Sequence, residues 1–147
     1  MKKLFSIMWF IIIASTSEIV IAASCGTGTT QVTNGNIESL LKGKFVCATR
    51  GSDTWRECHG TFSVSGSTCS NGNNLWDLKL GGNPMDPASL VGSWSRSGSI
   101  VSYNYGTGGA YSYEIYQIGT GSTYDFCGTS PSGNNVLSAS IQNTPCP

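Results

Sequence analysis

The sequence predicts an all-β protein: an eight-stranded antiparallel meander that closes into a small up-and-down barrel with a short N-terminal helix. Eight short segments rich in β-branched and aromatic residues follow one another, separated by clusters of glycine, serine, asparagine and aspartate. Most links are short enough for hairpins, and closing a meander removes its two exposed edges. Six cysteines predict a disulfide-stapled domain. A two-sheet β-sandwich is the alternative, since periodicity does not show closure.

The first 23 residues have the organisation of a secretory signal peptide. Two lysines follow the first methionine, and an apolar run extends from Leu4 to Ala14. Polar residues interrupt this run well short of the roughly 20 residues that span a bilayer, so we expect no transmembrane anchor after cleavage. The chain therefore divides into a signal peptide, residues 1–23, and one exported domain, residues 24–147, periplasmic or secreted. A lipoprotein anchored through Cys25 is a minor alternative.

A short helix and eight strands are expected in the mature domain. Asn36 is a suitable N-cap and Gly43 a suitable stop for the helix. Between them, Ile37, Leu40 and Leu41 share one face. The predicted strands are Phe45–Ala48, Thr54–His59, Leu75–Leu80, Val91–Arg96, Ile100–Tyr105, Ala110–Ile118, Thr123–Cys127 and Asn135–Gln142.

The spacing of the cysteines ranks some disulfide pairings above others. Cys58 and Cys69 bracket a polar, glycine-bearing excursion, so a bridge closing this loop is the first prediction. A hairpin across residues 130–133 would hold Cys127 and Cys146 too far apart for the Cα separation of about 5.5 Å that a disulfide needs. Cys146 is therefore expected to join Cys25 or Cys47. The predicted half-cystines are Cys25, Cys47, Cys58, Cys69, Cys127 and Cys146.

Alternation along the strands assigns aromatic side chains to a common inner face. In the segment 75–80 it groups Trp76 with two leucines, Leu78 and Leu80, and this set is predicted to lie inside. The hairpin 100–118 turns at its glycine-rich tip. There, pairing Tyr105 with Tyr111, Tyr103 with Tyr113 and Val101 with Ile115 would gather the four tyrosines on one face.

Such a face is either an ordinary core or the wall of a ligand cavity. Tyrosine offers an apolar ring with a hydroxyl that binds polar groups, which suits a ligand site. The candidate ligand-binding residues are Trp76, Trp94, Tyr103, Tyr105, Tyr111 and Tyr113.

Trp55, Glu57 and His59 alternate onto one face of a strand, where a carboxylate beside an imidazole can move a proton. No nucleophile elbow, second histidine or second carboxylate at a defined spacing accompanies them. The favoured interpretation is a polar, solvent-facing strand, with Glu57 and His59 as minor catalytic candidates.

Composition excludes several partners. Charged residues make up 11% of the chain and the net charge is zero, so there is no basic face for nucleic acid. His59 is the single histidine and no CxxC pair occurs, so no metal site is expected. No cofactor is predicted.

Two resemblances add to this reading. Gly92-Ser93-Trp94 opens a predicted strand and a tyrosine-rich meander follows, which resembles the G-x-W strand of lipocalin-like barrels and implies a barrel of that shape. The following segments together resemble small exported bacterial proteins of uncharacterised function: Gly43–Cys47, Trp55–His59, Leu75–Gly81, Val91–Trp94 and Tyr124–Gly128.

Three functions fit these observations. The first is a non-catalytic exported barrel that binds a small apolar or amphipathic ligand, or a partner protein, through its mouth or interior. The second is an envelope structural module, or an inhibitor of a host enzyme, acting through loops such as residues 58–74. The third is a small hydrolase or isomerase that uses Glu57 and His59.

Overall fold

The computed structural model describes residues 25–65, 67–78, 88–129 and 135–147. The predicted signal peptide, Leu80 and the turn at 130–133 lie outside these ranges. The described elements are β1 (Thr29–Val32), α1 (Gly35–Leu41), β2 (Lys44–Arg50), β3 (Asp53–Ser63), β4 (Thr68–Asp77), β5 (Ser89–Ser97), β6 (Ile100–Asn104), the 3-10 turn η1 (Gly106–Gly108), β7 (Ala110–Ile118), β8 (Thr123–Gly128) and β9 (Val136–Gln142).

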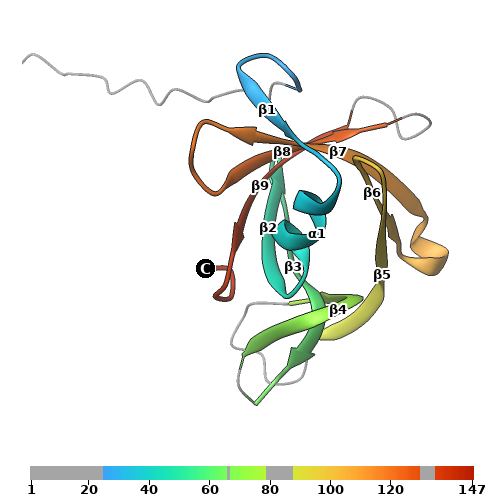
Figure 1. Cartoon of the computed structure of the whole chain (residues 1–147). Helices are drawn as coiled ribbons and strands as arrows, with labels where there is room; N and C mark the ends of the chain where they lie inside the picture. The colour runs from blue at the N-terminus through green and yellow to red at the C-terminus, as the bar shows by residue number, and fades with distance from the viewer. Residues whose placement is uncertain (1–24, 66, 79–87, 130–134) are drawn as a thin grey trace, which may run out of the picture.

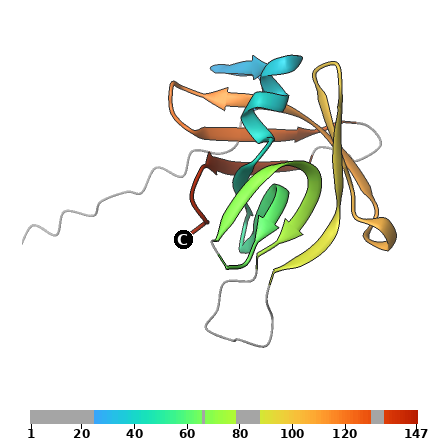
Figure 2. The same ribbon diagram turned by 60° about the horizontal axis from the view of Figure 1, so that its bottom comes forward.

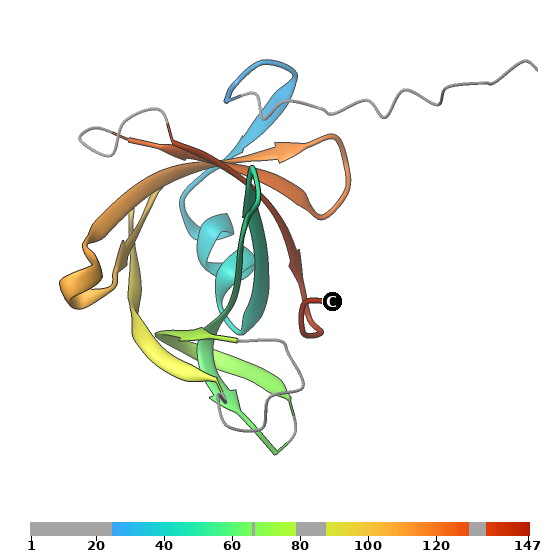
Figure 3. The same cartoon turned by 180° about the vertical axis from the view of Figure 1, so that it is seen from behind.

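Strands β2 to β9 form a closed antiparallel barrel. Each strand pairs with the next along the chain, and β9 pairs back to β2, from Phe45 opposite Gln142 to Thr49 opposite Ser138. Figure 1 and Figure 3 show the resulting ring of strands from its two sides. The predicted eight-stranded up-and-down barrel is therefore confirmed, and the sandwich alternative is wrong.

Strand β1 was not predicted. It pairs with the second half of β7, from Thr29 opposite Ile118 to Val32 opposite Ile115, beyond the residues of β7 that pair with β6. Its sequence is polar and shows no alternation, so it forms because β7 is longer than β6 and offers a free edge there.

Helix α1 closes one end of the barrel. It lies within the ring of strands in Figure 1, and Ile37 and Leu41 are fully buried in the main hydrophobic core. The helix begins at Gly35, one residue before the predicted cap, and Asn34 at its N-cap makes no side-chain hydrogen bond. Gly43 adopts a left-handed φ of 72°, which ends the helix as predicted.

The sequence indicated a loop at residues 58–74. The described residues of this segment instead belong to a long β3–β4 hairpin. The hairpin bends at Gly60, where the pairing register shifts, and its outer half is the arm formed by residues 61–63 and 68–70. This arm extends at the bottom of Figure 1 and comes forward in Figure 2. Phe62 on the arm packs edge-on against Phe45 on the outer face of the barrel, with ring centroids 6.3 Å apart.

The arm creates a second apolar cluster outside the barrel, and this overturns one prediction. Trp76 belongs to this outer cluster, with its ring 6.5 Å from Phe62, and Leu78 lies there too. Their neighbour Leu75 is fully buried in the main core instead. The predicted inward face of this strand was therefore wrong: Leu75 and Asp77 point inward.

All six cysteines lie in the described ranges and are paired. The Cys58–Cys69 bridge is confirmed, and Cys146 joins Cys47, one of its two expected partners. Cys25 joins Cys127. A sulfur bonded in this way cannot also carry a thioether-linked lipid, which argues against the lipoprotein alternative.

The β6–β7 hairpin keeps its predicted face but not its predicted register. Tyr103 lies opposite Tyr111 and Val101 opposite Tyr113, so the pairing is shifted by two residues from the expected one. The shift arises because η1 and Gly109 widen the turn, and Tyr105 lies just outside the paired region. A shift of two residues preserves the side of the sheet on which each side chain lies.

Candidate functional site

The barrel contains a cavity of about 560 Å³ at the end opposite α1. Its walls come from all eight barrel strands, β2 to β9, and Arg50, Thr54, Gly108 and Asn135 lie at the mouth, where strands end or begin. The inner residues that line it are Val46, Ala48, Trp55, Glu57, His59, Asp77, Val91, Tyr103, Tyr105, Tyr111, Tyr113, Phe126 and Leu137. The volume falls within the range of small-molecule sites, roughly 300–1,000 Å³.

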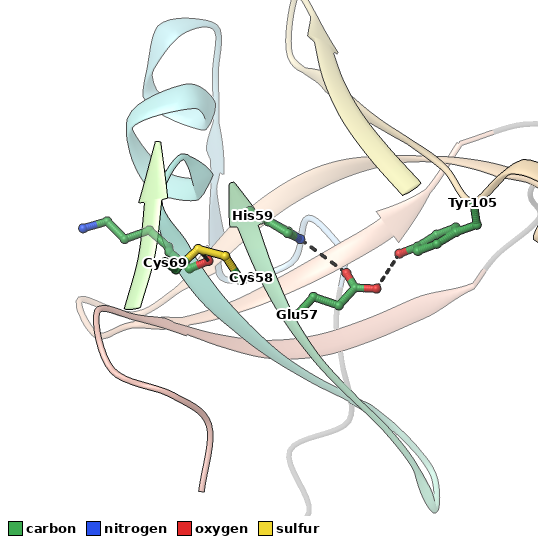
Figure 4. A network of polar contacts seen from close by, with 6 residues as sticks. Glu57, Cys58, His59, Cys69 and Tyr105 are labelled. Carbon is green, nitrogen blue, oxygen red and sulfur yellow. Dashed lines mark hydrogen bonds and ion pairs between the residues drawn. A yellow bond between two sulfur atoms is a disulfide. The ribbon is translucent and has the colours of Figure 1, made fainter. Parts of the chain in front are cut away.

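The carboxylate of Glu57 contacts two other polar side chains of this site, Tyr105 and His59. Its Oε1 atom accepts a hydrogen bond of 2.9 Å from the hydroxyl of Tyr105, and its Oε2 atom lies 3.3 Å from Nε2 of His59. Figure 4 shows Glu57 between these two side chains, while the Cys58–Cys69 bridge lies on the other side of β3. Alternation along β3 thus sends the polar residues inward and the half-cystine outward.

The prediction that Glu57 and His59 lie on a solvent-facing strand is therefore wrong. His59 is only 1% exposed and Glu57 only 7%, so both are interior residues. The ring of His59 packs 5.4 Å from Tyr103 and 5.9 Å from Trp94, between centroids. Among the described residues, its Nδ1 atom has no hydrogen-bond partner.

Aromatic rings build the remaining walls. Tyr103 is at their centre, contacting Tyr105, Tyr113 and Phe126 at centroid distances of 6.4, 5.9 and 6.5 Å. Tyr111 closes the set edge-on against Tyr105 at 6.1 Å. The hydroxyl of Tyr103 is buried and has no partner among the described residues. An interior hydroxyl without a partner is costly, because burial removes the hydrogen bonds that water would otherwise make to it.

Four of the six predicted ligand-binding residues line this cavity: Tyr103, Tyr105, Tyr111 and Tyr113. Trp94 is 3% exposed and lies behind His59 rather than on the cavity wall. Trp76 is on the outer face of the barrel, away from the site.

Sequence reasoning missed Asp77, Arg50 and Phe126 as lining residues. Asp77 was missed because placing Trp76 inside puts its neighbour Asp77, by alternation, on the outer face. Phe126 could have been found from the sequence, since it lies two residues after Tyr124 and therefore on the same face of a predicted strand, and Tyr124 is buried. Arg50 follows Ala48 at a spacing of two residues, which extends the inner face of β2 to the mouth.

Electrostatics keep the interior hydroxyls protonated. Burial, and then the neighbouring Glu57 carboxylate, raise the pKa of Tyr103 well above its usual value of 10.0. Burial, the charge of Glu57 and the hydrogen bond to it raise the pKa of Tyr105 in the same direction. Both groups therefore remain hydrogen-bond donors through the physiological pH range.

These raised pKa values predict alkaline destabilisation. In the unfolded chain the two phenols lose protons near pH 10.0, whereas the folded barrel retains them. The unfolded state then binds fewer protons, so the free energy of unfolding falls as pH rises above about 10. Urea denaturation midpoints at pH 8 and pH 11 measure the loss, and Tyr105→Phe should reduce it. A loss as large in Tyr105→Phe as in the wild-type protein would contradict this prediction.

The arrangement can bind a molecule that is apolar over most of its surface and polar at one end. Among the described residues, no cluster of histidine, cysteine and carboxylate side chains could hold a metal ion. No helix in the described ranges is long and apolar enough to cross a membrane. Comparison of the chain with protein-family models, curated proteins and solved structures finds no match. The two sequence resemblances therefore remain predictions.

Proposed function

We propose that this chain is exported, by means of residues 1–23, as a non-catalytic barrel that binds a small amphipathic ligand in its cavity. The three disulfides are compatible with an oxidising compartment outside the cytoplasm. Periplasm and external medium fit the proposal equally.

The cavity itself carries the proposal. A barrel of this size can fill its interior with side chains, as the α1 end does with Ile37 and Leu41. At the other end about 560 Å³ is open, and its walls are aromatic rings with a few convergent polar groups. That combination is typical of small-molecule sites.

Tryptophan fluorescence tests the proposal, because Trp55 lines the cavity and Trp94 lies behind His59. Titration with N-phenyl-1-naphthylamine, a neutral apolar fluorophore, should quench this emission with a stoichiometry of about one per chain. Trp76→Phe is the control, since its ring lies outside the barrel and its loss should not reduce binding. A probe that neither binds nor quenches would contradict the proposal and leave a partner protein at the mouth as the remaining hypothesis.

A second candidate function rests on the contact between Glu57 and His59. A carboxylate 3.3 Å from an imidazole inside a cavity can serve proton transfer in a hydrolase or isomerase. His59 is nearly inaccessible, however, and it packs among rings as a core residue does. One variant distinguishes the two functions. If the barrel only binds a ligand, His59→Gln should retain probe binding; if it is an enzyme, the same variant should lose turnover of any substrate found.

A further inference from the structure

The connection between β1 and α1 contains an exposed Asn–Gly pair, Asn34 and Gly35 (Figure 1). Asn34 has a positive φ of 47°, which residues other than glycine seldom adopt and which the surrounding structure must maintain. Two hydrogen bonds of 3.1 Å do so here. The amide of Asn36 donates to the carbonyl of Thr33, and that of Ile37 to the carbonyl of Asn34. The start of α1 therefore holds Asn34 in one conformation.

This conformation places the side chain of Asn34 beside the backbone nitrogen of Gly35. The ψ angle of Asn34 is −127°. For an L-residue, this angle brings the Cα–Cβ bond close to eclipsing the bond from the carbonyl carbon to the nitrogen of Gly35. Rotation about the Cα–Cβ bond then suffices to bring the side-chain amide carbon to that nitrogen, where the two would close a five-membered ring.

Neither reacting group is engaged elsewhere in the described part of the chain. The side chain of Asn34 makes no capping hydrogen bond, and the amide N–H of Gly35 has no hydrogen-bond partner among the described residues. A Cβ atom at position 35 would have no other atom within 4 Å, so the backbone there has room to change its geometry. The pair is therefore open to water and free to react.

The second Asn–Gly pair of the sequence, Asn71 and Gly72, lacks these features. Asn71 lies within β4, and the positive ψ of extended backbone turns its Cβ atom away from the following nitrogen. Gly72 packs against the backbone of Gly60, since a Cβ atom at position 72 would lie 3.3 Å from the carbonyl carbon of Gly60. The same dipeptide thus occurs once in a reactive conformation and once in an unreactive one.

We infer that Asn34 is a site of spontaneous deamidation, a covalent modification that the chain carries out on itself at the start of α1. The backbone nitrogen of Gly35 loses its proton to water and attacks the side-chain amide carbon of Asn34. The new C–N bond closes a succinimide ring, the bond from that carbon to the amide nitrogen breaks, and the nitrogen leaves as ammonia after taking up a proton.

Water then opens the ring in one of two ways, and no oxidant or reductant takes part. Addition to the side-chain carbonyl breaks its bond to the nitrogen of Gly35 and leaves an aspartate at position 34. Addition to the backbone carbonyl breaks the other carbon–nitrogen bond of the ring. The product is an isoaspartate, in which the main chain runs through the former side chain and is one carbon longer.

The isoaspartate product loosens α1, whereas the aspartate product does not. In isoaspartate the carbonyl group that accepts from the amide of Ile37 is no longer part of the main chain. Ile37 is fully buried in the core at the end of the barrel that α1 closes, so its displacement opens this core. Aspartate keeps the normal backbone and is a favourable N-cap residue.

Incubation of the folded protein at mildly alkaline pH, followed by peptide mass spectrometry, tests the inference. The peptide containing Asn34 should gain the mass of an –NH2 group replaced by –OH, at least about tenfold faster than the peptide containing Asn71. Labelling with a protein isoaspartyl methyltransferase should detect isoaspartate at position 34, and the denaturation midpoint should fall as the label increases. In the reduced, unfolded chain both pairs should react at similar rates.

Gly35→Ala is the matched variant. Its methyl group has open space in the fold and alanine favours a helix, but the group hinders attack by the neighbouring nitrogen, so deamidation should slow by roughly tenfold. Asn34→Gly accepts the positive φ and has no amide to lose, so its midpoint should not fall during incubation. Equal rates at Asn34 and Asn71 in the folded protein, or an unchanged rate in Gly35→Ala, would overturn the inference.

Discussion

Gly60→Ala is expected to destabilise the folded protein by at least about 3 kcal/mol, a large part of the total stability of a small domain. A Cβ atom at position 60 would lie 1.9 Å from the carbonyl oxygen of Ser70. Backbone atoms cannot yield as a flexible side chain can. The β3–β4 hairpin would have to open, and the packing of Phe62 against Phe45 would be lost with it.

Two further glycine variants provide reference values for this loss of stability. Gly92→Ala should have a comparable effect, because its Cβ would lie 2.1 Å from the carbonyl oxygen of Asn104, where β5 approaches β6. Gly121→Ala should be nearly neutral, since no atom lies within 4 Å of its Cβ position. Urea denaturation of the three variants measures the differences. A Gly60→Ala protein as stable as Gly121→Ala would show that the hairpin does not approach itself so closely.

Ala48→Phe is expected to abolish ligand binding while the barrel remains folded. Ala48 lines the cavity directly opposite Trp55, so a phenylalanine ring there would extend into the open space. Overfilling a packed core costs about 1–3 kcal/mol, and a cavity that can take the ring lowers this cost. The affinity for N-phenyl-1-naphthylamine should fall by well over tenfold, since the ring would occupy the space that the ligand needs.

Thr49→Phe is the matched control. Thr49 is the next residue on β2 and its exposed side chain points out of the barrel, so the same ring is added on the other face. It should bind the probe as the wild-type protein does. Circular dichroism and a denaturation midpoint establish that both variants are folded. Undiminished binding by Ala48→Phe would show that the ligand does not use this cavity.

The barrel could be predicted because its topology is local. Every link between β2 and β9 joins neighbouring strands, so segments bounded by turn residues were enough to give the order. The Cys58–Cys69 bridge could be predicted for the same reason, since it closes a short excursion. Closure between β2 and β9 is a long-range pairing, and it followed only from the argument that exposed edges are unfavourable.

The errors of face assignment on β3 and β4 share one physical cause, the arm formed by residues 61–63 and 68–70. Face assignment assumed an apolar interior and a solvated exterior, but the arm covers the outside of β2 to β4 with a second apolar cluster. Trp76 is therefore partly buried outside the barrel, whereas Glu57 and His59 are buried inside it. Alternation divides a strand into two faces correctly, yet it does not say which face is inward when both are covered.

The most direct test is a native mass spectrum of the wild-type protein, exported by its host and purified without refolding, compared with that of Ala48→Phe. The wild-type protein should carry an extra mass that disappears under denaturing conditions, and the variant should carry none. A bare wild-type protein, or the same extra mass on both proteins, would contradict a ligand site inside the barrel.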